Sequence, residues 1–227
     1  FAPGGEVALC GHATAAAYGA LALDGRLGEL PASVASVAPG GRVRGRVERE
    51  GEGVVVWMDM PIAERVDAEL DLEAIAAAVG LPVEVLTSRP AAAVEDVGIR
   101  VALLPVADLA ALDAMRPDFA RLRALGAPDR LTVYYPFVFD ADAGRVRARS
   151  FAPAVDIDED PATGTAVASL GAWLAREGLV AGRAELRVRQ GEVMGRPSEI
   201  RLRVERRGSR PTAIRIGGWV RGERADR

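Results

Sequence analysis

Two alanine-rich segments that are apolar on every side constrain this fold more than any other feature. The first, residues 12–23, reads HATAAAYGALAL and carries no charged side chain. The second, residues 163–177, reads TGTAVASLGAWLARE and is followed by Gly178. A helix without a polar face must be buried on all sides, and small side chains let strands approach it closely. We therefore expect two central helices, each enclosed by a sheet.

A similar short sequence precedes each of the two helices. Phe1-Ala2-Pro3 precedes the first helix, and Phe151-Ala152-Pro153 precedes the second. The pattern predicts a strand, a loop and a buried helix, occurring twice, although coincidence in a chain rich in Ala, Gly and Pro is the alternative. Because duplicated halves commonly meet at a shared cleft, we expect loops 9–14 and 157–165 to face each other.

The rest of the chain predicts an α+β protein. Turn residues and hydrophobic periodicity predict helices at 71–80, 107–115 and 117–125, and strands at 43–48, 54–60, 83–87, 99–105, 131–139, 145–152, 183–189, 199–206 and 212–220. We place a first half at 1–62, a second half at 63–210, and a C-terminal strand at 211–227 that returns toward the first half.

The composition excludes several kinds of active site. All 29 basic residues are Arg, so the chain has no lysine for a pyridoxal phosphate Schiff base or a phosphate-binding loop. One His and one Cys exclude zinc clusters made of these residues. A Ser-His-Asp triad could use only His12. Proton chemistry must therefore use His12, Cys10 or some of the 32 carboxylates.

Charge and hydropathy give no indication that the chain binds nucleic acid or crosses a membrane. The net charge is −3 and the basic residues are scattered, so nothing indicates nucleic acid binding. We find no apolar run of the length that crosses a membrane and no signal peptide pattern. A single cysteine excludes a disulfide within the chain and fits a reducing cytoplasm.

The starts of the two apolar helices gather the groups suited to proton transfer. Cys10 and His12 stand at the first start, and Asp158, Glu159 and Asp160 precede the second. Helix N-termini present unpaired N–H groups that can hold a carboxylate or an enolate oxygen. Structural roles stay open: His12 as a cap, Cys10 as a small buried apolar residue, and Asp160 as a charge placed for the helix dipole.

Four blocks of sequence carry a further signal. They are Leu9–Thr14 (LCGHAT), residues 151–166 with FAP and EDPATGTA, Gln190–Ser198 (QGEVMGRPS) and Ile216–Gly218 (IGG). In order and spacing, over essentially the whole chain, they resemble the blocks of PhzF-like phenazine-biosynthesis isomerases. The resemblance implies the diaminopimelate-epimerase-like fold, in which two similar halves each roll a mostly antiparallel sheet around a central helix. It also implies a homodimer without metal or cofactor.

The resemblance implies roles for single residues. His12 and Asp160 would line the site and relay protons, with Cys10 a weaker catalytic candidate. Gly11, Gly164 and Thr165 would contact a small carboxylate-bearing substrate, with Glu159 beside them; Thr165 stands where Ser is more usual.

The family also carries an opening segment with a Ser-Glu-Thr motif whose Glu is its principal acid and base. No Ser-Glu-Thr occurs in this sequence, which starts at Phe1 inside an expected strand. Without opening strands the first helix would expose apolar surface, so we expect a segment before Phe1.

Three functions follow from these observations. The first is a PhzF-like isomerase that moves a proton or double bond by acid–base chemistry in the cleft between the halves. The second is an epimerase or racemase of the same superfold with Cys10 as one base. The third is a binding protein that kept the fold and lost the Glu and the chemistry.

Overall fold

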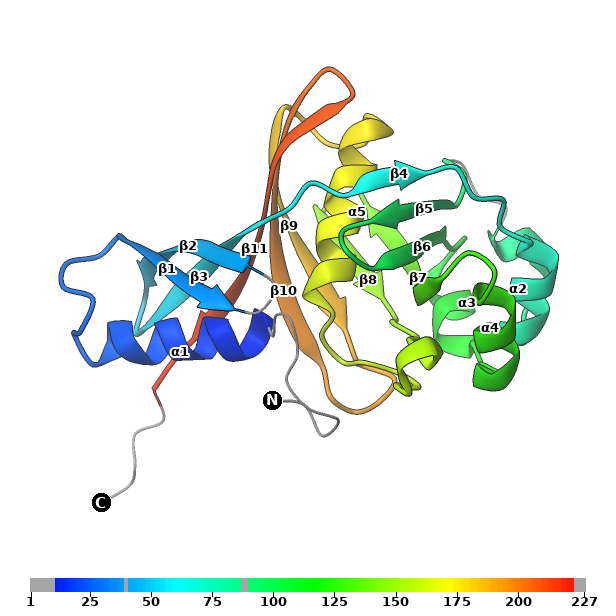
Figure 1. Cartoon of the computed structure of the whole chain (residues 1–227), viewed down its shortest axis with the longest axis horizontal. Helices are drawn as coiled ribbons and strands as arrows, with labels where there is room; N and C mark the ends of the chain where they lie inside the picture. Colours follow the sequence, from blue (N-terminus) through cyan, green and yellow to red (C-terminus); the bar gives the residue numbers. More distant parts are fainter. Residues whose placement is uncertain (1–10, 39–40, 87–89, 223–227) are drawn as a thin grey trace. The chain divides into compact units, whose positions relative to one another are not determined.

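The structure, a computed structural model, describes residues 11–38, 41–86 and 90–222. Contacts divide the chain into two compact units (Figure 1). Unit 1 contains Phe1–Met60 and Arg215–Arg227, and unit 2 contains Pro61–Ile214. Strand β11 (Arg210–Val220) begins in unit 2 and ends in unit 1.

Unit 1 is a sheet with one helix against it. The strand order is β1 (Ala32–Ala38), β2 (Gly41–Glu50), β3 (Gly53–Met60) and β11, and the pairs β1–β2 and β2–β3 are antiparallel. Gly217 lies against Trp57 so closely that a Cβ at this position would come within 2.7 Å of the indole ring. This close approach explains one glycine of the IGG block.

Helix α1 (Gly11–Leu23) is where the predicted first central helix lies, but the prediction that it is buried on every side is wrong for the described residues. Its buried residues are Ala15, Tyr18, Gly19 and Ala22, whereas Ala13, Ala16, Ala17 and Ala20 are exposed. The physical reason is that α1 contacts mainly β3 and, to a smaller extent, β2, which cover one side of it.

Unit 2 is built on a longer mixed sheet. Its strands are ordered β10 (Ser198–Arg207), β9 (Arg183–Gln190), β8 (Arg145–Ala148), β7 (Leu131–Asp140), β6 (Arg100–Pro105), β5 (Ala93–Asp96) and β4 (Glu64–Val66). The pairs β6–β7 and β8–β9 are parallel, and the other neighbours in this series are antiparallel.

Helix α5 (Gly164–Arg176) is the central helix of unit 2. Every residue from Ala166 to Ala175 is buried, which confirms the prediction for this helix. The helix contacts β10 near one end of the strand order and β5 and β6 toward the other, so the sheet curls around it. A Cβ at Gly171 would lie 2.9 Å from Leu202 Cδ1, which shows how closely β10 approaches.

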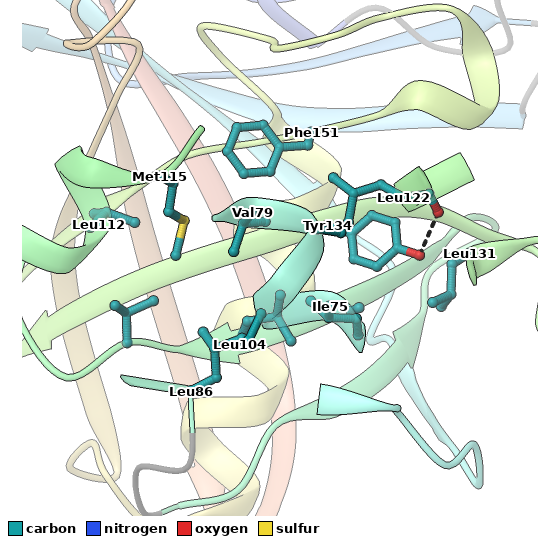
Figure 2. Close-up of a cluster of buried hydrophobic side chains, with 14 of the residues drawn as sticks. Ile75, Val79, Leu86, Leu104, Leu112, Met115, Leu122, Leu131, Tyr134 and Phe151 are labelled. Carbon is teal, nitrogen blue, oxygen red and sulfur yellow. Dashed lines mark hydrogen bonds between the residues drawn. The ribbon is translucent and has the colours of Figure 1, made fainter. Parts of the chain in front are cut away.

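A second hydrophobic layer covers the opposite face of β6 and β7. It includes the helices α2 (Leu72–Val79), α3 (Leu109–Ala114) and α4 (Phe119–Gly126), whose N-cap residues are all aspartates, and the 3₁₀ helix η1 (Val83–Leu86). Ala102 and Leu104 belong to this layer, and since side chains alternate along a strand, their neighbours point toward α5. Figure 2 shows Tyr134 in this layer, with its hydroxyl donating to the Leu122 carbonyl over 2.8 Å.

Two further findings complete the description of the fold. The strand predicted at 83–87 is wrong, because Val83–Leu86 form η1, with Val85 N–H bonded to the Pro82 carbonyl. No helix among the described residues is both long and apolar enough to span a membrane.

Candidate active site

The loop before α5 holds the Asp160 carboxylate in a defined position. The backbone N–H of Asp160 donates to the Ser150 carbonyl over 3.0 Å. Asp160 Oδ1 accepts from the Ala162 N–H at 3.2 Å, and Oδ2 accepts from the Thr163 hydroxyl at 2.6 Å. Asp160 is half-buried, and its own loop holds both carboxylate oxygens.

A buried glutamine joins this loop to the sheet. Gln190, the last residue of β9, is 1% exposed, and its Nε2 donates to the Asp160 carbonyl at 2.5 Å and to Thr163 Oγ1 at 3.1 Å. Its Oε1 accepts from the Tyr135 hydroxyl at 3.0 Å. Burial, and then the charge of Asp160, raise the pKa of Tyr135 well above its usual range, so this hydroxyl remains a donor.

The block that starts at Gln190 packs against the loop that carries Asp160. Gly191 has φ +82°, and a Cβ there would lie 2.9 Å from Pro161 Cβ. Ser198 Oγ donates to the Pro161 carbonyl at 2.5 Å. Two sequence blocks that lie some thirty positions apart therefore form one structural unit in unit 2.

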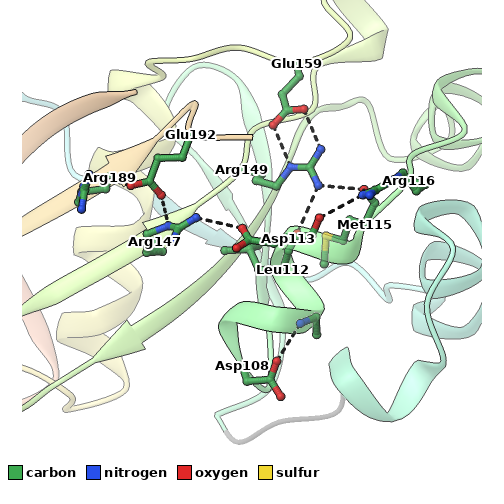
Figure 3. Close-up of polar contacts among 11 residues, drawn as sticks. Asp108, Leu112, Asp113, Met115, Arg116, Arg147, Arg149, Glu159, Arg189 and Glu192 are labelled. Atoms are coloured by element: carbon green, nitrogen blue, oxygen red, sulfur yellow. Dashed lines mark hydrogen bonds and ion pairs between the residues drawn. The ribbon is translucent and has the colours of Figure 1, made fainter. Parts of the chain in front are cut away.

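Glu159, next to Asp160, is held by an arginine. Arg149 donates from Nε to Glu159 Oε1 at 2.9 Å and from Nη2 to Oε2 at 2.8 Å. Arg149 Nη1 donates to the carbonyls of Leu112 and Met115, at 3.3 and 2.9 Å, beside the end of α3 (Figure 3). The sequence predicted that Glu159 contacts the substrate. In the structure both of its carboxylate oxygens bind Arg149.

A row of charges continues from this ion pair along the neighbouring strands. Arg147 bonds to Asp113 Oδ1 at 2.9 Å and to Glu192, and Glu192 also pairs with Arg189 at 2.9 Å (Figure 3). Because Glu192 belongs to the block that begins at Gln190, these ion pairs attach that block to the α3 region through Arg147.

The first turn of α5 offers hydrogen-bond donors beside Asp160. Gly164 and Thr165 are its first two residues, both half-buried, and the N-cap residue Thr163 makes no capping bond with its side chain. Thr163 uses its hydroxyl for Asp160 instead. N–H groups at the start of a buried helix can hold an anion, and here they adjoin a carboxylate that can exchange a proton.

The other predicted residues lie in unit 1 or outside the described range. Gly11 and His12 are the first two residues of α1, and His12 is exposed. Cys10 falls outside the described residues. Within residues 11–38, 41–86 and 90–222, no group of three or more His, Cys, Asp or Glu is placed to hold a metal ion.

Sequence reasoning missed three polar members of the site. Ser150, Tyr135 and Gln190 all lie within the Asp160–Thr163 hydrogen-bond network. Gln190 opens one of the four blocks, which was a usable signal. Ser150 and Tyr135 lie within predicted strands, and the sequence carried no sign of their role.

Comparisons with known proteins agree with this architecture. The sequence model of the family described as "Phenazine biosynthesis-like protein" matches residues 1–220. An "uncharacterized isomerase" of Deinococcus radiodurans is 34% identical over 99% of this chain and 74% of the relative. A trans-2,3-dihydro-3-hydroxyanthranilate isomerase of Pseudomonas aeruginosa is 30% identical over 96% of this chain and 73% of that enzyme.

A solved structure shows the same fold. The crystal structure of a PhzF-family phenazine biosynthesis protein from Bacillus anthracis aligns with a TM-score of 0.83 at 24% identity, over 97% of this chain and 77% of that one. The predicted α+β class and epimerase-like fold are therefore confirmed.

Proposed function

Since the chain belongs to the phenazine-biosynthesis-like (PhzF-like) family, we propose that it is an isomerase that moves a proton, and with it a double bond, on a small metabolite bearing a carboxylate. Relatives across the family are named isomerases, which supports isomerase activity. The observation that carries the finer proposal is the Asp160 carboxylate, half-buried and fixed by two donors immediately before the N-terminus of α5.

In the proposed reaction, Asp160 removes a proton from a carbon of the substrate. The electron pair of the broken C–H bond forms a new double bond, the existing double bond shifts, and a proton is returned to the carbon at its far end. The product has the same formula as the substrate. N–H groups of Gly164 and Thr165 and the Thr165 hydroxyl would hold the substrate carboxylate, where the helix dipole offsets its charge.

Further parts of the proposal come from the family motif. His12 would handle the second proton, and Gly11 would contact the substrate. The resemblance also favours a cytoplasmic homodimer that works without metal or organic cofactor. The complete absence of lysine is consistent with chemistry that does not pass through a pyridoxal phosphate Schiff base.

The proposal is tested by proton exchange. Protein dialysed against EDTA is incubated in D2O with trans-2,3-dihydro-3-hydroxyanthranilate and with a panel of unsaturated carboxylates, and deuterium uptake and double-bond position are followed by mass spectrometry and NMR. We expect Asp160→Asn to lower turnover by about 100- to 10,000-fold. Absence of uptake into every compound, with the full-length protein, would favour a binding role.

Three further variants separate this function from its alternatives. Asp158→Asn is the matched control, because Asp158 is an exposed carboxylate in the same loop, and it should keep turnover within about twofold. His12→Ala should lower turnover without unfolding the protein. Cys10→Ala should keep full activity; a large loss would instead support the thiol-dependent epimerase.

A further inference from the structure

Gln190 has only one orientation that satisfies its neighbours. The Asp160 carbonyl can only accept and lies 2.5 Å from one end of the amide, so that end must be the nitrogen. The nitrogen also donates to Thr163 Oγ1 at 3.1 Å, and the buried Tyr135 hydroxyl donates to the amide oxygen over 3.0 Å. Both hydrogens of the nitrogen have acceptors, and Tyr135 supplies the donor that the oxygen needs.

The orientation of Gln190 in turn fixes the hydrogen of Thr163. Thr163 Oγ1 accepts from Gln190 and lies 2.6 Å from Asp160 Oδ2 and 2.9 Å from Ser150 Oγ. A carboxylate can only accept, so the single Thr163 hydrogen goes to Oδ2, and the Ser150 hydroxyl donates to Thr163. Every oxygen and nitrogen in this chain of contacts then has a consistent role.

The same amide also holds the backbone. Gln190 Nε2 donates to the Asp160 carbonyl, while the Asp160 N–H donates to the Ser150 carbonyl at 3.0 Å. Asp160 is therefore fixed at its N–H, its carbonyl and both carboxylate oxygens. Loss of the Gln190 contacts would release the Asp160 carbonyl and would free Thr163 from the bond that directs its hydrogen onto Oδ2.

We propose that Gln190, supported by Tyr135, is a positioning residue for Asp160: it directs the Thr163 hydrogen onto Oδ2 and fixes the Asp160 backbone. This inference rests on the proposed proton transfer by Asp160. If Tyr135 cannot donate, the buried Gln190 oxygen is left without a donor, and the amide is held in place less firmly. Its bonds to the Asp160 carbonyl and to Thr163 then weaken, although every residue of the loop is still present.

The test compares two adjacent buried tyrosines. Tyr135→Phe should lower kcat about tenfold with KM changed less than about twofold, because Gln190 loses the bond that holds its amide and then positions the reacting carboxylate less firmly. Tyr134→Phe is the matched control, since the Tyr134 hydroxyl donates to the Leu122 carbonyl and stands outside the network. It should keep kcat within about twofold. Gln190→Leu should reproduce the Tyr135→Phe loss or exceed it.

A double-mutant cycle distinguishes positioning from general support of the fold. In an Asp160→Asn background, Tyr135→Phe should have almost no further effect on kcat, because the group that it positions is already gone. An equal tenfold loss in both backgrounds, or wild-type kcat in Tyr135→Phe, would overturn the inference.

A readout that needs no substrate keeps this inference separate from the proposed function. In protein labelled with ¹⁵N, the Gln190 side-chain amide hydrogens should exchange slowly with water, and Tyr135→Phe should speed that exchange about tenfold or more, while Tyr134→Phe should not. Fast exchange in the wild type would overturn the inferred orientation even in an active enzyme. Slow exchange in a protein without any isomerase activity would uphold the orientation and overturn the proposed function.

Discussion

The guanidinium of Arg149 and the carboxylate of Glu159 form a bidentate ion pair, and their side chains are only 6% and 12% exposed. The Arg149 guanidinium also lies 4.9 Å from the centre of the Phe151 ring. Because Glu159 directly precedes Asp160, this pair attaches the loop of the candidate site to the segment that directly follows β8.

Glu159→Gln should lower the free energy of unfolding by about 3 kcal/mol, because it leaves the Arg149 charge buried without its counter-charge. Urea denaturation followed by circular dichroism measures the change. The matched control is Asp156→Asn, which breaks a 2.6 Å pair with Arg123 whose side chains are 84% and 51% exposed. That change should stay below about 1 kcal/mol. Equal losses in both variants would contradict the argument.

Glu95 offers a second buried charge in unit 2. Its carboxylate is 0% exposed and is paired with Arg65 at 2.8 Å and with Arg176 at the end of α5. Glu95→Gln should therefore lower the free energy of unfolding by about 3 kcal/mol in urea titrations. Asp96→Asn is the neighbouring control, since Asp96 pairs with Arg100 at 3.5 Å and is 37% exposed, and it should cost less than about 1 kcal/mol.

The same residue shows why some strands could not be predicted. Strand β5 reads AVED, and its fully buried Glu95 breaks the hydrophobic pattern that identifies a strand. Burial is tolerated only because two arginines, from β4 and α5, meet this carboxylate. A partner 81 positions away, as Arg176 is, leaves no local signal in the sequence.

The two central helices show what amino-acid composition can and cannot predict about burial. Both are rich in alanine, and the sequence predicted both, but only α5 is buried on every side, from Ala166 to Ala175. In α1 four alanines face outward. Small apolar side chains are compatible with burial and do not require it, so the number of strands around a helix had to come from the structure.

For the candidate site, local signals in the sequence placed the acidic Asp160 just before the second apolar helix, and the family resemblance added Gly164 and Thr165. It did not identify the Tyr135–Gln190 contact, which joins two strands across 55 positions. Such a contact depends on which strands become neighbours. Here the parallel pairing of β8 with β9 helps to set that order, and no short-range pattern specifies it.

Alkaline pH should destabilise the protein through its buried tyrosines. Burial, and then the charge of Asp129, raise the pKa of Tyr134 to about 12, and the pKa of Tyr135 is raised as well. In the unfolded chain a tyrosine ionises near its ordinary pKa of about 10. Above that pH the unfolded state releases protons that the folded state retains, so stability should fall as pH rises from about 10 to 12.

Urea midpoints at pH 9, 10 and 11, with tyrosinate absorbance at 295 nm, measure this effect. The chain has no lysine, so no lysine titration overlaps this range. Tyr134→Phe should flatten the pH dependence in part. An unchanged slope in that variant would show that Tyr134 does not contribute.

Two glycines in one loop test whether the loop is held by packing or only by backbone conformation. Gly191 and Gly195 both have positive φ, +82° and +67°, which disfavours any residue with a Cβ. A Cβ on Gly195 meets nothing within 4 Å, so Gly195→Ala should cost only the strain, about 1–2 kcal/mol. A Cβ on Gly191 would lie 2.4 Å from the Arg196 carbonyl and 2.9 Å from Pro161 Cβ.

Gly191→Ala should therefore cost about 2 kcal/mol more than Gly195→Ala in thermal or urea unfolding, because backbone atoms must move in addition to the strain. The displaced Pro161 directly follows Asp160, so Gly191→Ala should also lower turnover, whereas Gly195→Ala should not. If both variants lose the same stability and keep turnover, the contact between Gly191 and Pro161 has no part in holding the Asp160 loop.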